Sequence, residues 1–197
     1  FMHELARAEA TGSYPAPTRR RSEGALSRGP IGPVVLWNLI RRCNLTCKHC
    51  YAFSADHDYP GELSLAQVFG VMDDLKAFNV PALILSGGEP LLREDIFEIA
   101  ERAKAMKFYV GLSTNGTLID APLAARIHAT GFDYVGISLD GIGATHDKFR
   151  RLAGAFDRSL AAVRHLQKLG TKVGLRFTMT DLNKHDLPNL LQLMRDE

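Results

Sequence analysis

The stretch Cys43-Asn44-Leu45-Thr46-Cys47-Lys48-His49-Cys50 contains all three cysteines of the chain. It follows an apolar run, residues 34–40, that predicts a β-strand. Thiolates are preferred ligands of zinc and of iron–sulfur clusters. Because a cubane cluster has four irons, three cysteines would leave one iron with an open position, which a catalytic metal site needs and a structural site avoids. The stretch therefore predicts a metal centre that binds a further molecule.

The composition is that of a folded globular protein, with 197 residues, of which 46% are hydrophobic and 23% charged. Residues 1–33 carry five arginines and three glutamates, so they account for the whole formal net charge of +2. The remaining residues are formally neutral, which argues against a basic surface for nucleic acid.

Residues 1–33 are rich in Gly and Pro and lack apolar periodicity, so we expect a flexible leader ahead of a folded core at 34–197. We expect the run Arg19-Arg20-Arg21 to be solvated rather than bound to an anionic partner. The sequence shows no apolar run approaching the ~20 residues of a membrane span and no secretory signal. An odd number of clustered cysteines does not suit a disulfide framework. These features predict a cytoplasmic protein that contacts no membrane.

From residue 34 onward, strand and helix patterns alternate. The predicted strands are 34–40, 82–86, 108–113, 134–139 and 172–179, and the predicted helices are 65–78, 94–106, 122–130, one around 160–169 and one from Leu187. Ser64-Leu65-Ala66-Gln67 predicts a capping box. Such alternation is typical of an α/β fold with parallel strands, either an open sheet or an incomplete barrel, because a full eightfold barrel needs about 250 residues. The missing closing strand predicts that the natural protein continues beyond Glu197.

Three predicted strands share a glycine followed two positions later by a polar residue. The pairs are Gly111 and Ser113, Gly136 and Ser138, and Gly174 and Arg176. Because side chains alternate along a strand, each pair lies on one face. We expect the glycines to open space on the inner face and the polar residues to converge at the carboxyl ends of the strands, where ligands bind in such folds.

The other strand ends are also chemically unusual. Strand 82–86 leads into Gly87-Gly88-Glu89-Pro90, strand 108–113 into Thr114-Asn115, and strand 134–139 into Asp140. A zwitterionic nucleoside would suit this rim. The glycine backbone and Glu89 suit an ammonium, Arg176 suits a carboxylate, and Ser138 or Asp140 suits ribose hydroxyls.

The Cys-x3-Cys-x2-Cys spacing after the first strand, with Gly-Gly-Glu-Pro after the second, resembles the radical S-adenosylmethionine (SAM) superfamily. Over about residues 34–197 the resemblance implies a partial (β/α)6 TIM-like barrel, truncated here at about the fifth strand–helix unit. It implies a [4Fe–4S] cluster on Cys43, Cys47 and Cys50, with SAM bound at the open iron. It also implies reductive cleavage of SAM to methionine and a 5′-deoxyadenosyl radical, with ferredoxin or flavodoxin as electron donor.

Position by position, the resemblance implies the following contacts. The cofactor-binding residues would be Gly87, Gly88 and Glu89 at the methionyl ammonium, Ser138 and Asp140 at the ribose, Arg176 at the carboxylate, Tyr51 near the adenine, and Ser113 and Asn115 on the same rim. One departure is His49, since the position before the last cysteine is often aromatic in this superfamily. His49 or His57 also raises a zinc alternative, a binding module without catalysis, although zinc leaves the Gly-Gly-Glu-Pro segment unexplained.

Five further segments resemble the NirJ-type family of haem d1 biosynthesis, namely residues 37–45, 50–52, 60–63, 85–93 and 173–178. This resemblance implies a sirohaem-derived tetrapyrrole substrate that loses propionate side chains. Relatives of that family with a C-terminal SPASM domain modify peptides, so a peptide is the alternative substrate. Because these families carry further cysteines for an auxiliary cluster and this sequence has none, we expect the chain to end before that domain.

The remaining charged residues are expected to be structural or solvated. His146, Asp147, Arg150, Arg151 and His185 are predicted on loop or helix surfaces. A contact between the arginines and substrate carboxylates is the minor alternative.

Overall fold

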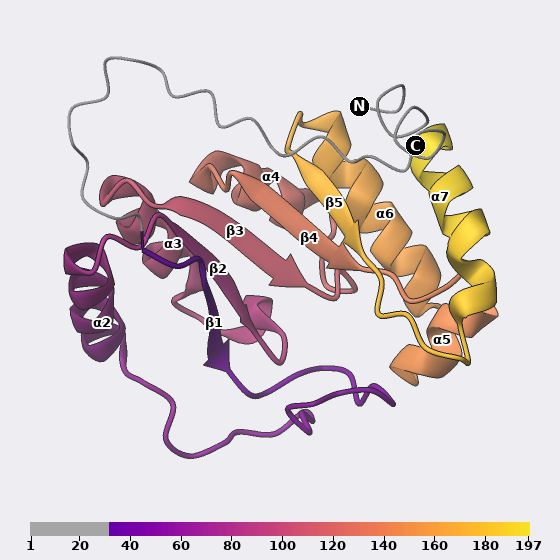
Figure 1. Cartoon of the computed structure of the whole chain (residues 1–197), viewed down its shortest axis with the longest axis horizontal. Helices are drawn as coiled ribbons and strands as arrows, with labels where there is room; N and C mark the ends of the chain where they lie inside the picture. Colours follow the sequence, from indigo (N-terminus) through magenta and orange to yellow (C-terminus); the bar gives the residue numbers. More distant parts are fainter. Residues whose placement is uncertain (1–31) are drawn as a thin grey trace, which may run out of the picture. The chain divides into compact units, whose positions relative to one another are not determined.

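The computed structural model describes residues 32–197, and in this part of the chain five strands form one parallel sheet in the order β1-β2-β3-β4-β5 (Figure 1). The strands are β1 (Val35–Ile40), β2 (Ala82–Gly87), β3 (Tyr109–Thr114), β4 (Tyr134–Ser138) and β5 (Val173–Arg176). The predicted leader at 1–33 lies outside the described residues except for its last two positions. Strand order follows chain order, as right-handed crossovers produce when a sheet curls in one direction.

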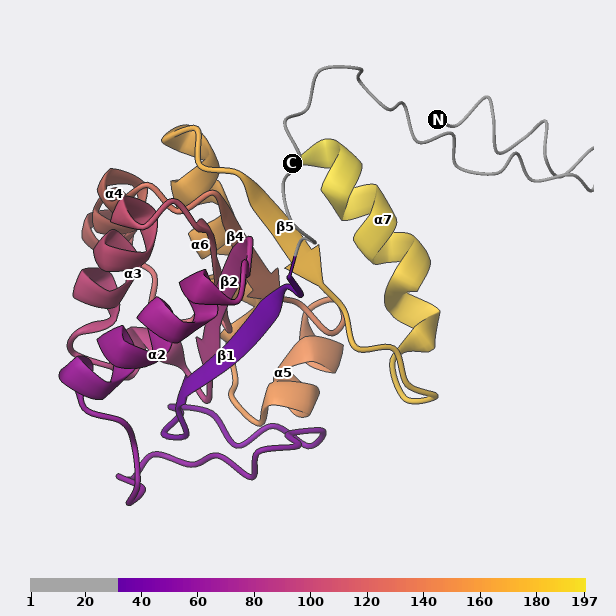
Figure 2. The same cartoon turned by 60° about the vertical axis from the view of Figure 1, so that its left-hand side comes forward.

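The helices that cross over between strands lie together on one face of the sheet (Figures 1 and 2). They are α2 (Leu65–Ala77), α3 (Ile96–Ala105), α4 (Ala121–Thr130) and α6 (Ala155–Lys168). The short helix α5 (Ala144–Arg150) lies beyond the end of β4, and α7 (Leu187–Asp196) follows β5. Two 3-10 turns occupy Pro90–Leu92 and Lys184–Asp186. The crossover helices therefore leave the opposite face of the sheet free for a functional site.

The core lies between the sheet and these helices. Alternate strand residues point into it, and Leu83, Leu85, Val110, Leu112 and Val135 are fully buried there. Burying each such side chain contributes roughly 1.5–3 kcal/mol relative to leaving it exposed. This alternation confirms that the residues between the repeat's glycines and polar groups face the helices.

The local signals read from the sequence are present in the structure. The Ser64 hydroxyl accepts from the Gln67 amide (3.4 Å), and the Ser64 amide donates to the Gln67 side chain (2.8 Å), which confirms the capping box. Helix α4 ends at Gly131 in the left-handed conformation, with φ of 78°.

Two elements differ from the prediction. Strand β5 ends at Arg176, short of the expected residue 179, because the Thr178 amide donates to the Asp140 carboxylate (2.9 Å) instead of extending the ladder. Helix α5 is not among the helices predicted from the sequence. It begins after Gly143, at φ of 50°, and lacks a capping side chain, so the sequence carries no helix-start signal there.

The glycines of the strand repeat do open space on the inner face, but neighbouring side chains fill it. A Cβ at Gly136 would lie 2.5 Å from Nε of Arg176, and a Cβ at Gly174 would lie 2.7 Å from the Tyr134 ring. The prediction of an open inner face is therefore correct only in part. The glycines make room for Arg176 and Tyr134.

No helix within residues 32–197 combines the length and apolarity needed to cross a membrane.

Candidate functional site

Residues 43–50, which carry the three cysteines, form the cysteine loop. A cavity of about 260 Å³ lies between this loop and the carboxyl ends of the strands. The predicted site residues that line it are Cys43, Cys47, Cys50, Tyr51, Gly87, Gly88, Ser113, Asn115, Ser138 and Arg176. A neighbouring cavity of about 460 Å³, next to Trp37 and Tyr59, is larger but is lined by none of the cysteines. We assign the site to the smaller cavity because it gathers the chemically reactive groups.

Backbone hydrogen bonds fix the cysteine loop in place. The Cys43 amide donates to Ala55 O (3.1 Å), and the Cys50 amide donates to Cys47 O (3.2 Å) within the loop. The Lys48 amide donates to Phe149 O of α5 (2.9 Å). The loop is therefore attached to the helix that the sequence did not reveal.

Each cysteine sulfur accepts a hydrogen bond. The Leu45 amide donates to Cys43 Sγ (3.4 Å), the Ser54 amide to Cys50 Sγ (3.5 Å), and Arg150 Nη1 to Cys47 Sγ (3.6 Å). Such donors stabilise thiolates, which is the form that binds iron. Within the described residues, no three Cys, His, Asp or Glu side chains are already gathered around one point as a metal group. The three sulfurs nevertheless line one cavity, and thiolates are the ligands that iron–sulfur clusters take, so the donor set fits such a cluster by its chemistry.

The three thiols differ in acidity. Burial raises the pKa of Cys43 to about 12 and raises the pKa of Cys47 despite the nearby Arg150. Burial opposes ionisation of Cys50 as well, but backbone hydrogen bonds at Ser54, Ala52 and Phe53 outweigh it and lower its pKa. Binding of a metal centre would therefore release protons from Cys43 and Cys47.

The Gly87-Gly88-Glu89-Pro90 segment lies directly on the chain that enters the cysteine loop. The Gly88 amide donates to Ile40 O (2.7 Å), and the Glu89 amide donates to Arg42 O (2.9 Å). Gly87 has φ of 147°, and a Cβ at Gly88 would clash with the backbone of Arg42. The two glycines are required for this close approach.

The Glu89 side chain is fully buried and does not line the cavity. Its oxygens accept from Thr114 Oγ1 (2.8 Å), Asn115 N (2.8 Å) and Leu91 N (3.2 Å). Burial raises its pKa to about 7, against these hydrogen bonds. In this position the Glu89 carboxylate links the Gly-Gly segment to the end of β3.

Amide side chains connect the end of β3 to the cysteine loop. Asn115 Nδ2 donates to Asn44 Oδ1 (2.9 Å) and lies 3.9 Å from Cys43 Sγ. Asn44 Nδ2 donates to Thr117 Oγ1 (2.9 Å). Asn44 and Thr117 were not among the predicted site residues, because their role depends on contacts between distant segments.

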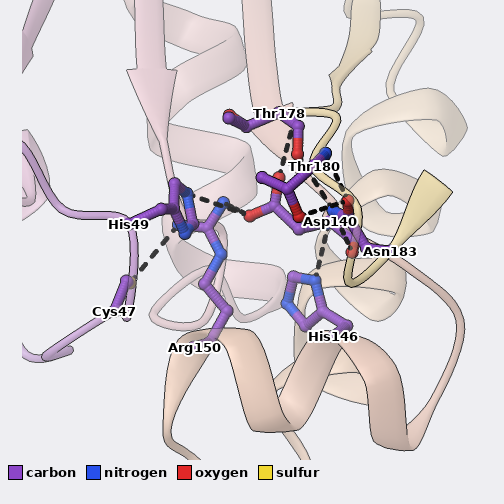
Figure 3. A network of polar contacts seen from close by, with 8 residues as sticks. All are labelled: Cys47, His49, Asp140, His146, Arg150, Thr178, Thr180 and Asn183. Atoms are coloured by element: carbon purple, nitrogen blue, oxygen red, sulfur yellow. Dashed lines mark hydrogen bonds and ion pairs between the residues drawn. The ribbon is translucent and has the colours of Figure 1, made fainter.

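Asp140 is also fully buried and does not line the cavity. Figure 3 shows the polar contacts around it. Its Oδ1 accepts from the Thr178 amide (2.9 Å), and its Oδ2 lies 2.5 Å from Arg150 Nη2 and 3.3 Å from His49 Nε2. His146 Nδ1 accepts from the Asp140 amide (2.9 Å). The carboxylate predicted for ribose is thus engaged by protein groups.

The surface assignment of several residues of α5 was wrong. His146 and Arg150 are buried, with 1% and 8% of their surface exposed, and the Asp147 carboxylate accepts from the Gly154 amide (2.7 Å) and the Phe156 amide (2.9 Å). Arg151 is exposed, as expected. The available signal was the i, i+4 spacing of His146 and Arg150, which puts both on one face of a helix just after a strand end.

The remaining predicted contacts lie around the cavity. Arg176 donates to the Ser113 hydroxyl across the inner face. The Tyr51 hydroxyl donates to Asn38 Oδ1 (3.2 Å), while most of the ring is exposed.

The two histidines of the zinc alternative have other partners. The His49 ring packs against Phe149, with centroids 5.2 Å apart, and faces Asp140. The exposed His57 stacks on Tyr59, with centroids 4.1 Å apart.

Comparison with known proteins identifies relatives of the whole described region. The family model described as the radical SAM superfamily matches residues 37–194. "Pre-heme d1 synthase" of Dinoroseobacter shibae is 55% identical over 184 residues, which are 93% of this chain and 44% of the relative. "Fe-coproporphyrin III synthase" of Methanosarcina barkeri is 46% identical over 165 residues, 84% of this chain and 41% of the relative. The chain therefore spans less than half the length of these relatives.

The fold is shared with Streptococcus suis SuiB bound to S-adenosylmethionine, with a TM-score of 0.71 at 16% identity over 82% of this chain and 37% of that chain. This likeness confirms the partial TIM-like barrel. A [4Fe–4S] cluster and SAM are the characteristic cofactors of the matched family. From the match across residues 37–194 and the identity to these relatives, the chain belongs to the radical SAM superfamily.

Proposed function

We propose that Cys43, Cys47 and Cys50 hold a [4Fe–4S] cluster, and that SAM binds beside it in an enzyme acting on a tetrapyrrole. The proposed reaction removes propionate side chains from a sirohaem-derived substrate on the way to haem d1. The observation that carries the proposal is the single cavity in which three hydrogen-bonded sulfurs, the Gly-Gly segment, Ser138 and Arg176 meet.

Each wall of the cavity suits a different part of SAM. Gly87 and Gly88 bring backbone atoms to the methionyl end next to the cysteines. The guanidinium of Arg176 suits the carboxylate, and the Ser138 hydroxyl suits the ribose. Tyr51, beside Cys50, suits the adenine. In this superfamily the cluster and SAM together supply a 5′-deoxyadenosyl radical that removes a hydrogen atom from the substrate.

The cavity is too small to enclose SAM and a tetrapyrrole together, so we expect the larger substrate to lie outside it. Ligand cavities usually measure roughly 300–1,000 Å³, so about 260 Å³ is small for SAM and a tetrapyrrole together. Support for the tetrapyrrole comes from the two relatives at 55% and 46% identity, whose names both refer to haem or porphyrin products.

The electron would come from a small redox protein such as ferredoxin or flavodoxin. The cysteine loop is exposed at Thr46 and Lys48, neither of which lines the cavity. A donor can therefore approach this loop without passing through the substrate side.

The test is anaerobic incubation of the iron- and sulfide-reconstituted protein with SAM, dithionite and a sirohaem-derived substrate. We expect 5′-deoxyadenosine and methionine in equal amounts, together with a tetrapyrrole whose mass reports propionate loss. Deoxyadenosine formation that only a peptide stimulates would replace the tetrapyrrole by a peptide substrate. Stoichiometric zinc without iron uptake would contradict the enzyme altogether.

A further inference from the structure

The ion pair between Arg150 and Asp140 reaches one sulfur of the cysteine loop and serves no role assigned so far (Figure 3). We propose that Arg150 is a positioning residue for Cys47, held in place by Asp140, and that the pair sets the reduction potential of the cluster. The inference rests on the proposed cluster at Cys43, Cys47 and Cys50.

One guanidinium makes both contacts. Arg150 Nη1 lies 3.6 Å from Cys47 Sγ, and Arg150 Nη2 lies 2.5 Å from Asp140 Oδ2. The side chain of Arg150 is 10% exposed and that of Asp140 is 1% exposed. Because both side chains are largely buried, solvent screens the charge pair weakly, and its electric field at the sulfur is strong.

Asp140 is itself fixed by three other segments. The Thr178 amide, after β5, donates to Oδ1 (2.9 Å), and Asn183 Nδ2 donates to the Asp140 carbonyl (3.0 Å). His146 of α5 accepts from the Asp140 amide (2.9 Å). Because α5 also accepts the Lys48 amide through Phe149 O, the cation and the loop are positioned by the same helix.

The three cysteines are not treated alike. Cys43 accepts from the Leu45 backbone amide and Cys50 from that of Ser54, and Cys43 has the neutral Asn115 side-chain amide as a further donor at 3.9 Å. Among the described residues, only Cys47 accepts a hydrogen bond from a cation. A charge-assisted hydrogen bond to a ligating sulfur favours the reduced cluster and raises its potential, whereas a nearby carboxylate lowers it.

The two partners therefore predict shifts of opposite sign. Arg150→Met should lower the midpoint potential of the SAM-free cluster, with electron affinity reduced about tenfold, which equals about 59 mV for one electron. Asp140→Asn keeps a side-chain oxygen that can accept from Arg150 and removes the opposing charge, so it should raise the potential. Arg150→Lys should restore part of the loss. The matched control is Arg151→Met, which removes the same charge from the exposed neighbouring position.

The measurement is a redox titration followed by electron paramagnetic resonance, with iron and sulfide content determined for each variant. Working without SAM separates this role from a contact between Arg150 and the SAM carboxylate, since Arg150 also lines the cavity.

A potential of Arg150→Met equal to that of Arg151→Met would overturn the inference, even if SAM binding weakened. If Arg150→Met does not retain a cluster, Asp140→Asn decides: a positive shift supports the inference, and no shift or a negative one overturns it. Failure of the unmodified protein to assemble a cluster would instead contradict the proposed function.

Discussion

Two fully buried carboxylates, Glu89 and Asp140, are linked to the cysteine loop by different networks of polar contacts. Within residues 32–197, Glu89 accepts hydrogen bonds only from neutral donors, and its network continues through Asn115 and Asn44 toward Cys43. Asp140 is paired with Arg150, which continues to Cys47. In the first network the hydrogen-bond donors are neutral and burial raises the pKa of Glu89 to about 7, whereas the second network brings the Arg150 cation to a sulfur. A buried carboxylate can therefore fix a backbone segment through neutral hydrogen bonds, as Glu89 does, or hold a cation beside a sulfur, as Asp140 does.

Breaking the pair of Asp140 and Arg150 should cost more folding stability than breaking the Glu89 network. Asp140→Ala leaves Arg150 buried without its partner, which we expect to cost about 3–5 kcal/mol in the free energy of unfolding. Urea denaturation of the protein measures this loss. The matched variant Asp140→Asn with Arg150→Met removes both charges and should recover much of it. A loss below about 1 kcal/mol for Asp140→Ala would mean that the pair is solvated rather than buried.

The Glu89 network should make the stability of the protein depend on pH. Because the folded pKa of Glu89 is raised above its ordinary value of 4.5, to about 7, the folded state holds this proton more tightly. Its contribution to stability is therefore fully present below about pH 4.5, falls as pH rises to about 7 and then levels off. The shift corresponds to about 3 kcal/mol.

Glu89→Gln should remove this slope, so that its disadvantage relative to the unmodified protein shrinks between pH 4.5 and 7. Denaturation curves of both proteins across that range provide the measurement. Parallel pH profiles would contradict the raised pKa.

The amide link within the neutral network should have a smaller effect. Asn44→Ala removes the hydrogen bonds with Asn115 and Thr117, and we expect a loss of about 1–3 kcal/mol in stability because partly buried partners stay unsatisfied. The potential of a bound cluster should change less than in Arg150→Met, because no charge is removed. A larger potential shift in Asn44→Ala would reverse the assignment of the two networks.

A change outside both networks sets the baseline. Ser64→Ala removes the capping box of α2, which should cost about 1 kcal/mol in thermal or urea denaturation. Cluster content and potential should stay as in the unmodified protein. Loss of cluster in this variant would show that both properties follow global stability rather than the networks.

The sequence predicted what depends on neighbouring residues. The cysteine spacing, the capping box and the periodicity of the strands and helices are local signals, and the strand order follows from their alternation. Helix α5 lacked such a signal, since Gly143 begins it without a cap. The buried roles of His146 and Arg150 therefore came only from the structure.

Asp140 shows most clearly which part of the site the sequence does not predict. Its place after a strand end correctly predicted that it lies at the carboxyl rim. Which way a carboxylate points there depends on Arg150, ten residues along, and on Thr178 beyond β5. Pairings between such distant segments are set by packing, and a single sequence does not encode them in any local pattern.

The most direct test of the whole account is the metal content and electron paramagnetic resonance of the protein reconstituted anaerobically with iron and sulfide. We predict about four irons and four sulfides per chain and a signal on reduction that changes when SAM is added. We also predict loss of that cluster in Cys43→Ala, Cys47→Ala and Cys50→Ala with the secondary structure intact. Zinc in place of iron, or an unchanged cluster after any of these three replacements, would contradict it.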